Sequence, residues 1–277
     1  MFSPLAIRYK IKSISFLFLL FISSPSFSQQ INYGNNPSAG NYKLINGIKL
    51  YYEIYGKGEP VLLIHGNGGS ISSFKNNIPY FATKYKVITV DSRSQGKSLD
   101  AGDSISFELM ANDFITLLDS LQIDSCNVIG WSDGGITALI MAMRYPSRIK
   151  KIAASGANII PDSTALSAGL YKEMQEEYNR KKNMDLYKSS TEKNEWKLFL
   201  LDYFQPHINF SELAAIKCPS LIICGDRDLI RLEHTIKIYQ NIPNAWLWIV
   251  PNSGHGTLIE HADEFNKKVD EFFSRKW

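Results

Sequence analysis

Hydrophobic positions along the 277-residue chain follow two alternating patterns. Short continuous apolar runs suit strands that are covered on both faces, as in a parallel sheet. Longer segments with apolar residues every three or four positions suit amphipathic helices. The runs that predict strands are 61–64, 87–90, 127–129, 149–154, 221–223 and 246–250. Their alternation with helical segments predicts one α/β domain with a mostly parallel central sheet and helices on both faces.

The helical segments are defined by their apolar spacing. Met110, Phe114, Leu117, Leu118 and Leu121 form one stripe, and segments 136–143 and 265–273 repeat it. Before the first buried run, two alternating segments flank Asn46-Gly47. A two-residue turn of this composition predicts a β-hairpin over 42–52.

Residues 158–215 break the alternation because they contain no strand pattern and instead suggest helices. The pairs Glu176/Arg180 and Glu177/Lys181 have the i,i+4 spacing that favours a helix. A second independent domain is the alternative. Because the segment is short and interrupts the alternation late, we expect a helical lid over the sheet.

The N-terminus has the three parts of a secretory signal peptide over residues 1–28. Basic residues precede the apolar run 14–22, and small residues lead to an expected cleavage after Ser28. The apolar run is short beside the ~20 residues of a spanning helix, although an uncleaved anchor is the alternative. We expect a flexible tail over 29–41, a domain over 42–277, and an exported protein, periplasmic or secreted, without stable membrane insertion.

Charge removes one class of function. The formal net charge is +3, from 30 Lys and Arg against 27 Asp and Glu. Three of the basic residues, Arg8, Lys10 and Lys12, lie in the expected leader, so the remaining 27 balance the 27 acids. No basic stripe is present, which argues against a nucleic-acid partner.

The three cysteines, Cys126, Cys218 and Cys224, form an odd set without a C-x-x-C pair. If Cys218 and Cys224 bracket one strand, they lie roughly 20 Å apart at ~3.3 Å per residue. A disulfide needs Cα atoms within ~7 Å, so we expect free thiols.

Gly130-Trp131-Ser132-Asp133-Gly134 matches the G-x-S-x-G pattern of a nucleophile elbow. A predicted strand precedes it and a predicted helix follows it. Such a sharp reversal strains the central residue, and side chains two positions before and after it would collide. The pattern therefore predicts that Ser132 is presented as a nucleophile.

A serine hydroxyl needs a base to take its proton. His255 lies in the predicted loop between the last strand and the C-terminal helix, whereas His207, His234 and His261 fall in predicted helical segments. The imidazole in turn needs an acid that orients it. Two candidates follow the strand near 221–223, and we favour Asp228 over Asp226, which is expected in a turn. The chain order then matches that of a Ser-Asp-His hydrolase.

An acyl-transfer site also needs donors for its oxyanion. We expect these to be the backbone N–H groups of Asp133 and of Asn67, in the glycine-rich loop 65–69. His65 in that loop is expected to be structural. The loop lacks the G-K-[ST] ending of a P-loop, and no ligand motif predicts a metal or another cofactor.

In this order the motifs resemble the α/β-hydrolase superfamily over residues 42–277. They are H-G-x-G at 65–68, the segment 91–98, the nucleophile elbow, G-x-x-D at 225–228 and Gly254-His255. The resemblance implies an α/β-hydrolase fold with a late helical lid. One departure is Ser94, where relatives usually carry Gly, in a segment expected to be structural.

Residues 130–140, with 145–147 and 156–158, resemble more specifically the biphenyl hydrolase-like proteins, the valacyclovir hydrolase group. This resemblance implies cleavage of α-amino acid esters, with Asp133 holding the substrate ammonium. A helix dipole would also favour an Asp at this position without a ligand. Together with Asp133, Gly66 and Trp131 are expected to bind the substrate.

We therefore expect a serine hydrolase that cleaves small carboxylic esters through an acyl-enzyme. A carbon–carbon bond hydrolase of the ring-cleavage-product type shares this serine architecture. A proline-iminopeptidase-like aminopeptidase would need an acidic amine site in the lid, for which Glu173, Glu176 and Glu177 are candidates. A non-catalytic receptor is a fourth possibility, whereas haloalkane dehalogenases and epoxide hydrolases carry Asp at the position of Ser132.

Overall fold

The computed structural model describes residues 31–184 and 189–277. The predicted signal peptide over 1–28 lies outside the described residues. Within the described ranges, no helix combines the length and the apolar character needed to cross a membrane. Residues Asn32–Trp277 form one structural unit, to which the following description refers.

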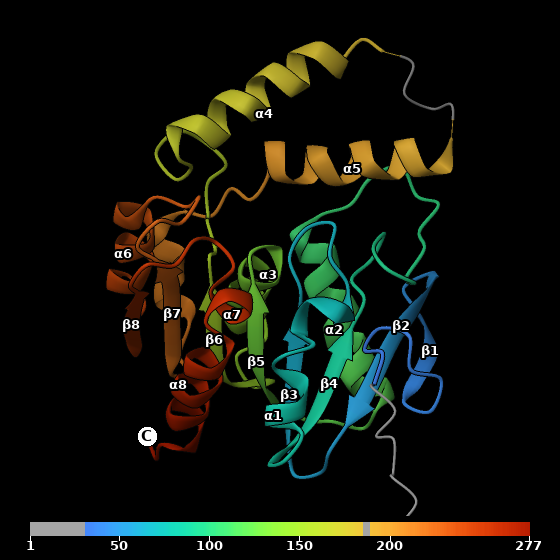
Figure 1. Ribbon diagram of the computed structural model, residues 1–277, viewed down its shortest axis with the longest axis vertical. Helices are drawn as coiled ribbons and strands as arrows, with labels where there is room; N and C mark the ends of the chain where they lie inside the picture. Colours follow the sequence, from blue (N-terminus) through green and yellow to red (C-terminus); the bar gives the residue numbers. More distant parts are fainter. Residues whose placement is uncertain (1–30, 185–188) are drawn as a thin grey trace, which may run out of the picture. The chain divides into compact units, whose positions relative to one another are not determined.

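In the described ranges, eight strands form one sheet in the order β1-β2-β4-β3-β5-β6-β7-β8 (Figure 1). The strands are β1 Gly40–Ile45, β2 Ile48–Tyr55, β3 Glu59–Ile64, β4 Tyr85–Val90, β5 Cys126–Trp131, β6 Ile149–Ser155, β7 Ser220–Gly225 and β8 Ala245–Val250. The pairs β1–β2 and β2–β4 are antiparallel, and every other neighbouring pair is parallel. Each predicted strand is therefore present, and the mostly parallel sheet is confirmed.

The predicted turn and helices are also present. Asn46 and Gly47 have φ values of 43° and 86°, which the tight turn of the hairpin requires. The three predicted stripes lie on α2 Phe107–Ser120, α3 Asp133–Arg144 and α8 Ala262–Ser274. Shorter elements complete this part of the chain: η1 Ile71–Phe74, α1 Ile78–Phe81, η2 Phe210–Ala215, α6 Leu232–Gln240 and α7 Thr257–Glu260.

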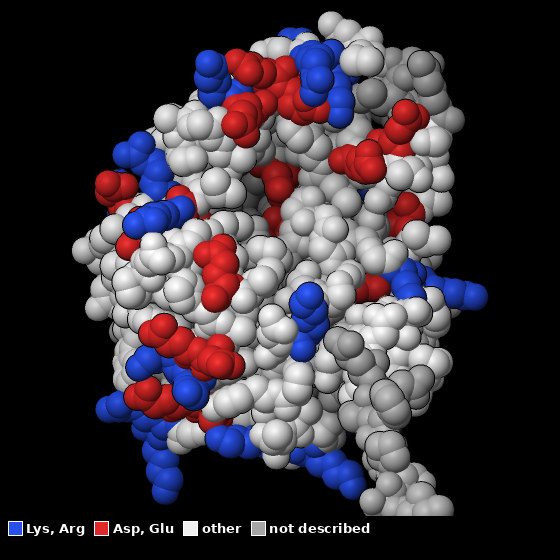
Figure 2. All heavy atoms as spheres, in the orientation of Figure 1, with Lys and Arg blue, Asp and Glu red and all other residues white. Residues whose placement is uncertain are grey.

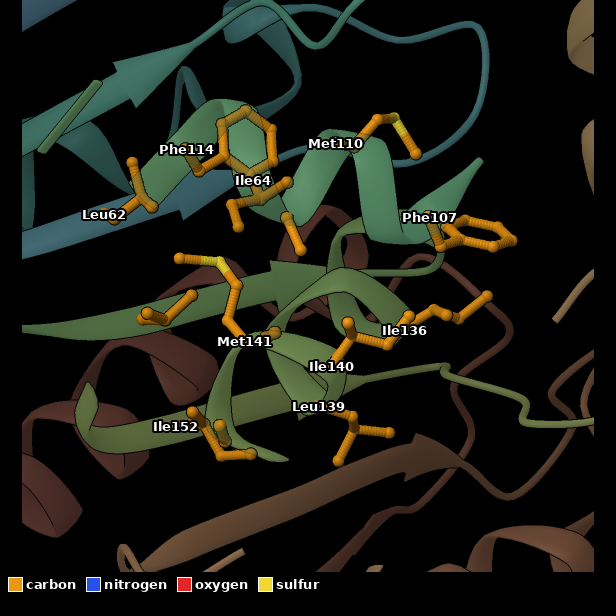
Figure 3. Close-up of a cluster of buried hydrophobic side chains, with 14 of the residues drawn as sticks. Leu62, Ile64, Phe107, Met110, Phe114, Ile136, Leu139, Ile140, Met141 and Ile152 are labelled. Atoms are coloured by element: carbon orange, nitrogen blue, oxygen red, sulfur yellow. The ribbon is translucent and has the colours of Figure 1, made fainter. Parts of the chain in front are cut away.

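Two apolar layers cover the faces of the sheet. On one face α2, α3 and α6 pack, and on the other α1, α7 and α8 pack. Figure 3 shows side chains of α2 and α3 gathered with those of β3 and β6: Leu62, Ile64, Phe107, Met110, Phe114, Ile136, Leu139, Ile140, Met141 and Ile152. This packing holds α3 rigidly behind the end of β5.

Between β6 and β7, the segment predicted as a lid contains α4 Ala168–Lys181 and α5 Ser190–Phe204, which we call the lid helices. Figure 1 shows both helices over one edge of the sheet. Aromatic rings join them, since Tyr178 stacks on Tyr203 with ring centroids 4.4 Å apart. The buried ammonium of Lys197 on α5 donates to the carbonyl oxygens of Asp100 and Gly102 at 3.1 and 2.9 Å. The second lid helix is thus fixed to the loop beneath it.

In the segment predicted as a flexible tail over 29–41, hydrogen bonds to the sheet hold Gly34 and Asn36. The backbone N–H groups of Gly34 and Asn36 donate to the buried Glu53 carboxylate at 2.9 and 3.0 Å. The hydroxyls of Tyr51 and Tyr55 donate to the same carboxylate. A buried carboxylate requires such donors, so Glu53 holds this segment in place, and β1 begins already at Gly40.

Candidate active site

Ser132 lies at the junction of β5 and α3 in a strained backbone conformation, with φ 55° and ψ −118°. Glycine is required on both sides of it. A Cβ at Gly130 would overlap the carbonyl oxygen of Gly134, and a Cβ at Gly134 would overlap that of Ile64. The sequence pattern therefore produces the predicted sharp elbow, with the serine at its tip.

Ser132, His255 and Asp228 form one hydrogen-bonded chain. The Ser132 Oγ lies 2.9 Å from Nε2 of His255, and His255 Nδ1 lies 2.6 Å from Oδ1 of Asp228. The Asp228 side chain is buried, and its oxygens also accept from the backbone N–H groups of Gly225 and Ile230. These bonds fix the carboxylate, which in turn fixes the tautomer and the orientation of the imidazole.

Asp226, the alternative acid, lies elsewhere in the same turn. Its Oδ1 accepts from the backbone N–H of Ser253 at 3.1 Å. Hydrogen bonds from the backbone N–H groups of Asn252 and Ser253 lower the pKa of this carboxyl. Asp226 therefore holds the loop that precedes His255, whereas Asp228 contacts the imidazole.

Other histidines take structural positions. His65 is buried, with Nδ1 2.7 Å from the Gly66 carbonyl oxygen, while its Nε2 accepts from the Ser92 N–H at 3.0 Å. His234 is buried on α6, and its Nε2 accepts from the Ile159 N–H. Ser94 has φ 66°, a left-handed backbone conformation that Gly adopts without strain. Among the residues that the structure describes, no group of three or more His, Cys, Asp or Glu side chains could hold a metal ion.

The loop 65–69 lies directly against the elbow. A Cβ at Gly66 would be only 3.0 Å from the Ser132 Cβ. The Asn67 side chain donates from Nδ2 to Asp133 Oδ2 at 3.0 Å and to the Leu198 carbonyl of α5 at 3.2 Å. Asn67 thus links the elbow to the lid helix α5. Asp133 is the first residue of α3, where a backbone N–H has no acceptor within the helix.

A cavity of about 170 Å³ lies beside Ser132 and His255, below the lid helices. This volume is smaller than the ~300–1,000 Å³ of most ligand pockets and suits a small acyl group. Its other lining residues are Asp133, Asn158, Leu166, Leu170, Met174, Asp202, Gln205, Leu229 and Ile230. Gly66 and Trp131, both predicted to bind substrate, are not among these lining residues. Figure 2 shows acidic side chains recessed in a hollow below the lid helices.

Two acidic residues, Asp133 and Asp202, line this cavity from α3 and α5. Asp133 Oδ2 accepts from the Asn67 side chain at 3.0 Å, and the two carboxyl groups lie close enough for their charges to interact. Burial, and secondly the charge of Asp202, raises the pKa of Asp133 well above its usual value. Burial also raises the pKa of Asp202, to about 6.

Asp202 was not among the predicted site residues, because it falls in a segment whose sequence shows only helical character. The predicted lid acids lie elsewhere. Glu176 pairs with Lys172, and Glu177 pairs with Arg180 and Lys181, all on the surface of α4. Glu173 is exposed. A signal for Asp202 existed in its helical spacing from Leu198, since it lies on the same face of the helix as Leu198 and Leu201, where a carboxylate is unexpected.

Comparison with known proteins gives consistent matches. The family model described as alpha/beta hydrolase fold matches residues 59–183. The mouse protein named serine hydrolase BPHL is 30% identical over 245 residues, covering 82% of this chain and 84% of the relative.

A second relative is the 2-hydroxy-6-oxononadienedioate/2-hydroxy-6-oxononatrienedioate hydrolase of Burkholderia vietnamiensis. It is 30% identical over 268 residues, covering 82% of this chain and 92% of the relative. Among solved structures, the enol-lactonase from Burkholderia xenovorans has the same fold with a TM-score of 0.71. Its sequence identity is 22%, and the match covers 85% of this chain and all of that one.

Proposed function

Because the chain belongs to the α/β-hydrolase family and is a hydrolase, we propose that it cleaves carboxylic esters through a serine acyl-enzyme. The observation that carries this proposal is the continuous hydrogen-bonded path from Ser132 through His255 to Asp228. A hydroxyl with a base at 2.9 Å can lose its proton as it attacks a carbonyl. Proteins of this geometry need no metal to form an acyl-enzyme.

In the proposed reaction, His255 Nε2 takes the Ser132 proton as Oγ bonds to the ester carbonyl carbon. Asp228 stabilises the imidazolium that forms. The backbone N–H groups of Asn67 and Asp133 stabilise the oxyanion, and Gly66 allows their loop to approach. His255 then protonates the leaving alcohol, and afterwards it activates the water that releases the acid.

Labelling with a fluorophosphonate probe tests the nucleophile. The wild-type protein should be labelled at Ser132 and should hydrolyse p-nitrophenyl butyrate, and Ser132→Ala should lose both properties. A replacement of Ser167 by Ala is the matched control, since this serine caps α4 and does not line the cavity. Labelling of the Ser132→Ala protein at the wild-type rate would contradict the proposal.

Within the ester class, we propose α-amino acid esters as substrates. The carboxyl of Asp133 faces the same cavity as the Ser132 hydroxyl, and the described residues that line it include neither Lys nor Arg. A cationic substrate group would be stabilised in such a cavity. An α-amino ester should therefore be cleaved faster than its des-amino analogue, and Asp133→Ala should reduce this preference.

The names of several relatives favour a second candidate, a carbon–carbon bond hydrolase. These relatives act on dienoates or dienedioates, which are anions, according to their names. An acidic pair without a Lys or Arg among the residues that line the cavity disfavours an anion, so we rank this candidate lower. Turnover of 2-hydroxy-6-oxo-6-phenylhexa-2,4-dienoate without cleavage of any ester would reverse the ranking.

An aminopeptidase remains a neighbouring candidate because Asp202 supplies an acid from the lid, although not one of the three predicted ones. Comparison of an amino acid ester with the p-nitroanilide of the same acid separates the two activities.

We also propose that the protein is exported and acts on small molecules without a nucleic-acid partner. N-terminal sequencing of the protein recovered outside the cytoplasm should begin at Gln29.

A further inference from the structure

The side chain of Asn67 has no part in the proposed reaction, in which only its backbone N–H acts on the oxyanion. The loop that carries it is closed by a turn, because the Gly69 N–H donates to the Gly66 carbonyl oxygen at 3.1 Å. Gly68, with φ 64°, occupies the left-handed position of this turn. The backbone N–H of Asn67 takes no part in the bond that closes the turn. The turn shapes the loop, but it does not connect Asn67 to the other proposed oxyanion donor.

The side-chain amide makes that connection. Asn67 Nδ2 donates to Oδ2 of Asp133 at 3.0 Å, and the backbone N–H of Asp133 is the second proposed donor. The two residues are 66 positions apart, one in the loop after β3 and the other at the start of α3. Both donors have to point at the same oxygen atom, and a misplacement of ~1 Å can cost ~10²-fold in rate. A bond between the two donor residues therefore restricts the quantity on which oxyanion stabilisation depends.

The same amide also bonds to the lid. Asn67 Nδ2 donates to the carbonyl oxygen of Leu198 on α5 at 3.2 Å. This helix is firmly attached to the domain beneath it, since Asn194 Nδ2 donates to the Ser94 carbonyl oxygen at 2.6 Å and the Lys197 ammonium is buried against the same loop. The described residues of α4 include no buried side chain, whereas α5 buries three. Of the two lid helices, α5 is therefore the one that can serve as a fixed support.

We propose that Asn67 is a positioning residue, whose side-chain amide holds the two oxyanion donors at their working separation while α5 holds the amide. This inference rests on the proposed ester hydrolysis and makes the second lid helix part of its catalytic geometry. A carboxamide suits the position because its Nδ2 has two N–H donors, one for a carboxylate and one for a helix carbonyl. A serine would offer one donor, and an ionised aspartate would offer none.

Asn67→Ala tests the proposal because it removes the amide and keeps the backbone N–H. The value of kcat for p-nitrophenyl butyrate should fall about 10- to 50-fold with little change in KM, less than the 10²- to 10³-fold of a lost donor. The inhibitor 1,1,1-trifluoropentan-2-one has the acyl chain of butyrate, and addition of the Ser132 hydroxyl to its carbonyl carbon gives a bound oxyanion. Its Ki should rise by the same factor as kcat/KM falls.

The matched control is Asn241→Ala at the end of α6. This change also removes an Nδ2 that donates to a helix carbonyl, that of Lys237 at 2.8 Å, but Asn241 does not line the cavity. Both kcat/KM and the Ki should stay unchanged in this variant. Urea denaturation of each variant confirms that it is folded under the assay conditions.

A double-mutant cycle tests the part played by α5. Lys197→Met keeps the length of the side chain but removes the ammonium that holds α5 to the loop, so kcat/KM should fall about three- to tenfold. In the Asn67→Ala background the same change should cost less than about twofold, because the amide through which α5 acts is already absent. Additive losses in the double variant, or no loss in Lys197→Met alone, would overturn the proposal.

Values of kcat/KM and Ki in Asn67→Ala within about twofold of the wild type would also overturn it. So would a fall in kcat/KM at unchanged Ki, because the amide would then act on the architecture of the site and not on the oxyanion. These outcomes leave the proposed hydrolase intact, since the wild type would still cleave the ester. Absence of ester cleavage by the wild type together with absence of Ser132 labelling would instead contradict the proposed function itself.

Discussion

The indole N–H of Trp131 donates a hydrogen bond to the carbonyl oxygen of His255 at 2.8 Å. Trp131 is the residue before the candidate nucleophile, and His255 is the candidate base from a loop 123 positions beyond Ser132. Their ring centroids lie 5.9 Å apart. Trp131 was predicted to bind substrate, but in the structure it connects the elbow to the backbone of the histidine loop.

Replacement of Trp131 by Phe should therefore lower kcat for ester hydrolysis about three- to tenfold and change KM little. Phe retains the ring but loses the hydrogen bond that holds His255 near Ser132, and one such bond contributes about 1 kcal/mol. Steady-state kinetics on a neutral ester measure this split. Trp248→Phe is the control, since Trp248 on β8 packs against Phe265, away from the elbow. An increase in KM at unchanged kcat would favour the original prediction of substrate binding.

The two aspartates of the β7–α6 turn should differ sharply in kinetics. Asp228→Asn removes the charge that stabilises the His255 cation and can reverse the imidazole tautomer, so kcat should fall by about 10³- to 10⁴-fold. Asp226→Asn weakens only the hydrogen bond from the backbone N–H of Ser253, so its loss should stay below about tenfold. Comparable losses in both variants would mean that the turn acts as a unit and would contradict the assignment of Asp228.

Much of the fold followed from local patterns. The buried strands are continuous apolar runs, such as 61–64, and Asn46-Gly47 predicts its turn because few other residue pairs accept two positive φ angles. The elbow was predictable for the same reason, since Gly130 and Gly134 leave no room for a Cβ. Where backbone geometry restricts the residue type, the sequence carries the information locally.

Contacts between segments that are distant in the sequence were harder to predict from the sequence. Glu53 occupies a position of β2 where the alternating apolar and polar pattern does not indicate that its side chain accepts four hydrogen bonds. The segment that it holds shows only residues typical of turns. Asp202 is one of several acids on helices, and only the packing of α5 over α3 brings it to the cavity. Neither position has a spacing that links it to its partner, so the sequence pattern predicted a mobile tail and surface acids.

Stability should depend on pH through two buried histidines. Burial lowers the pKa of His65 and of His234 to about 4, from 6.5. Between these values the folded state binds fewer protons than the unfolded state. The contribution of each histidine is therefore complete above pH 6.5 and is lost as the pH falls towards 4, at up to about 1.4 kcal/mol per pH unit.

The carboxyl groups of Asp133 and Asp202 have raised pKa values, so their effect on stability decreases as the pH rises, opposite to that of the histidines. The effect of one histidine is therefore measured as a difference in the free energy of unfolding between the wild type and a variant. The free energy of unfolding of the wild type minus that of His234→Gln should grow as the pH rises from about 4 to 6.5 and stay constant above it. Urea denaturation at several pH values provides this difference. An equal difference at about pH 4.5 and about pH 7 would contradict a neutral His234 that accepts from Ile159.

The strained backbone at Ser132 should make its glycine variant more stable than its alanine variant. Both variants lack the hydroxyl, but only Gly adopts φ 55° without strain, which costs about 1–3 kcal/mol for other residues. The greater freedom of Gly in the unfolded chain offsets about 0.5–1 kcal/mol of this gain. Ser132→Gly should therefore unfold at higher denaturant concentration than Ser132→Ala. At Asn112, an exposed position within α2, the order should be reversed, because Gly is a poorer helix former than Ala. If alanine proved more stable at both positions, the elbow would store no strain, and the nucleophile would be held by packing alone.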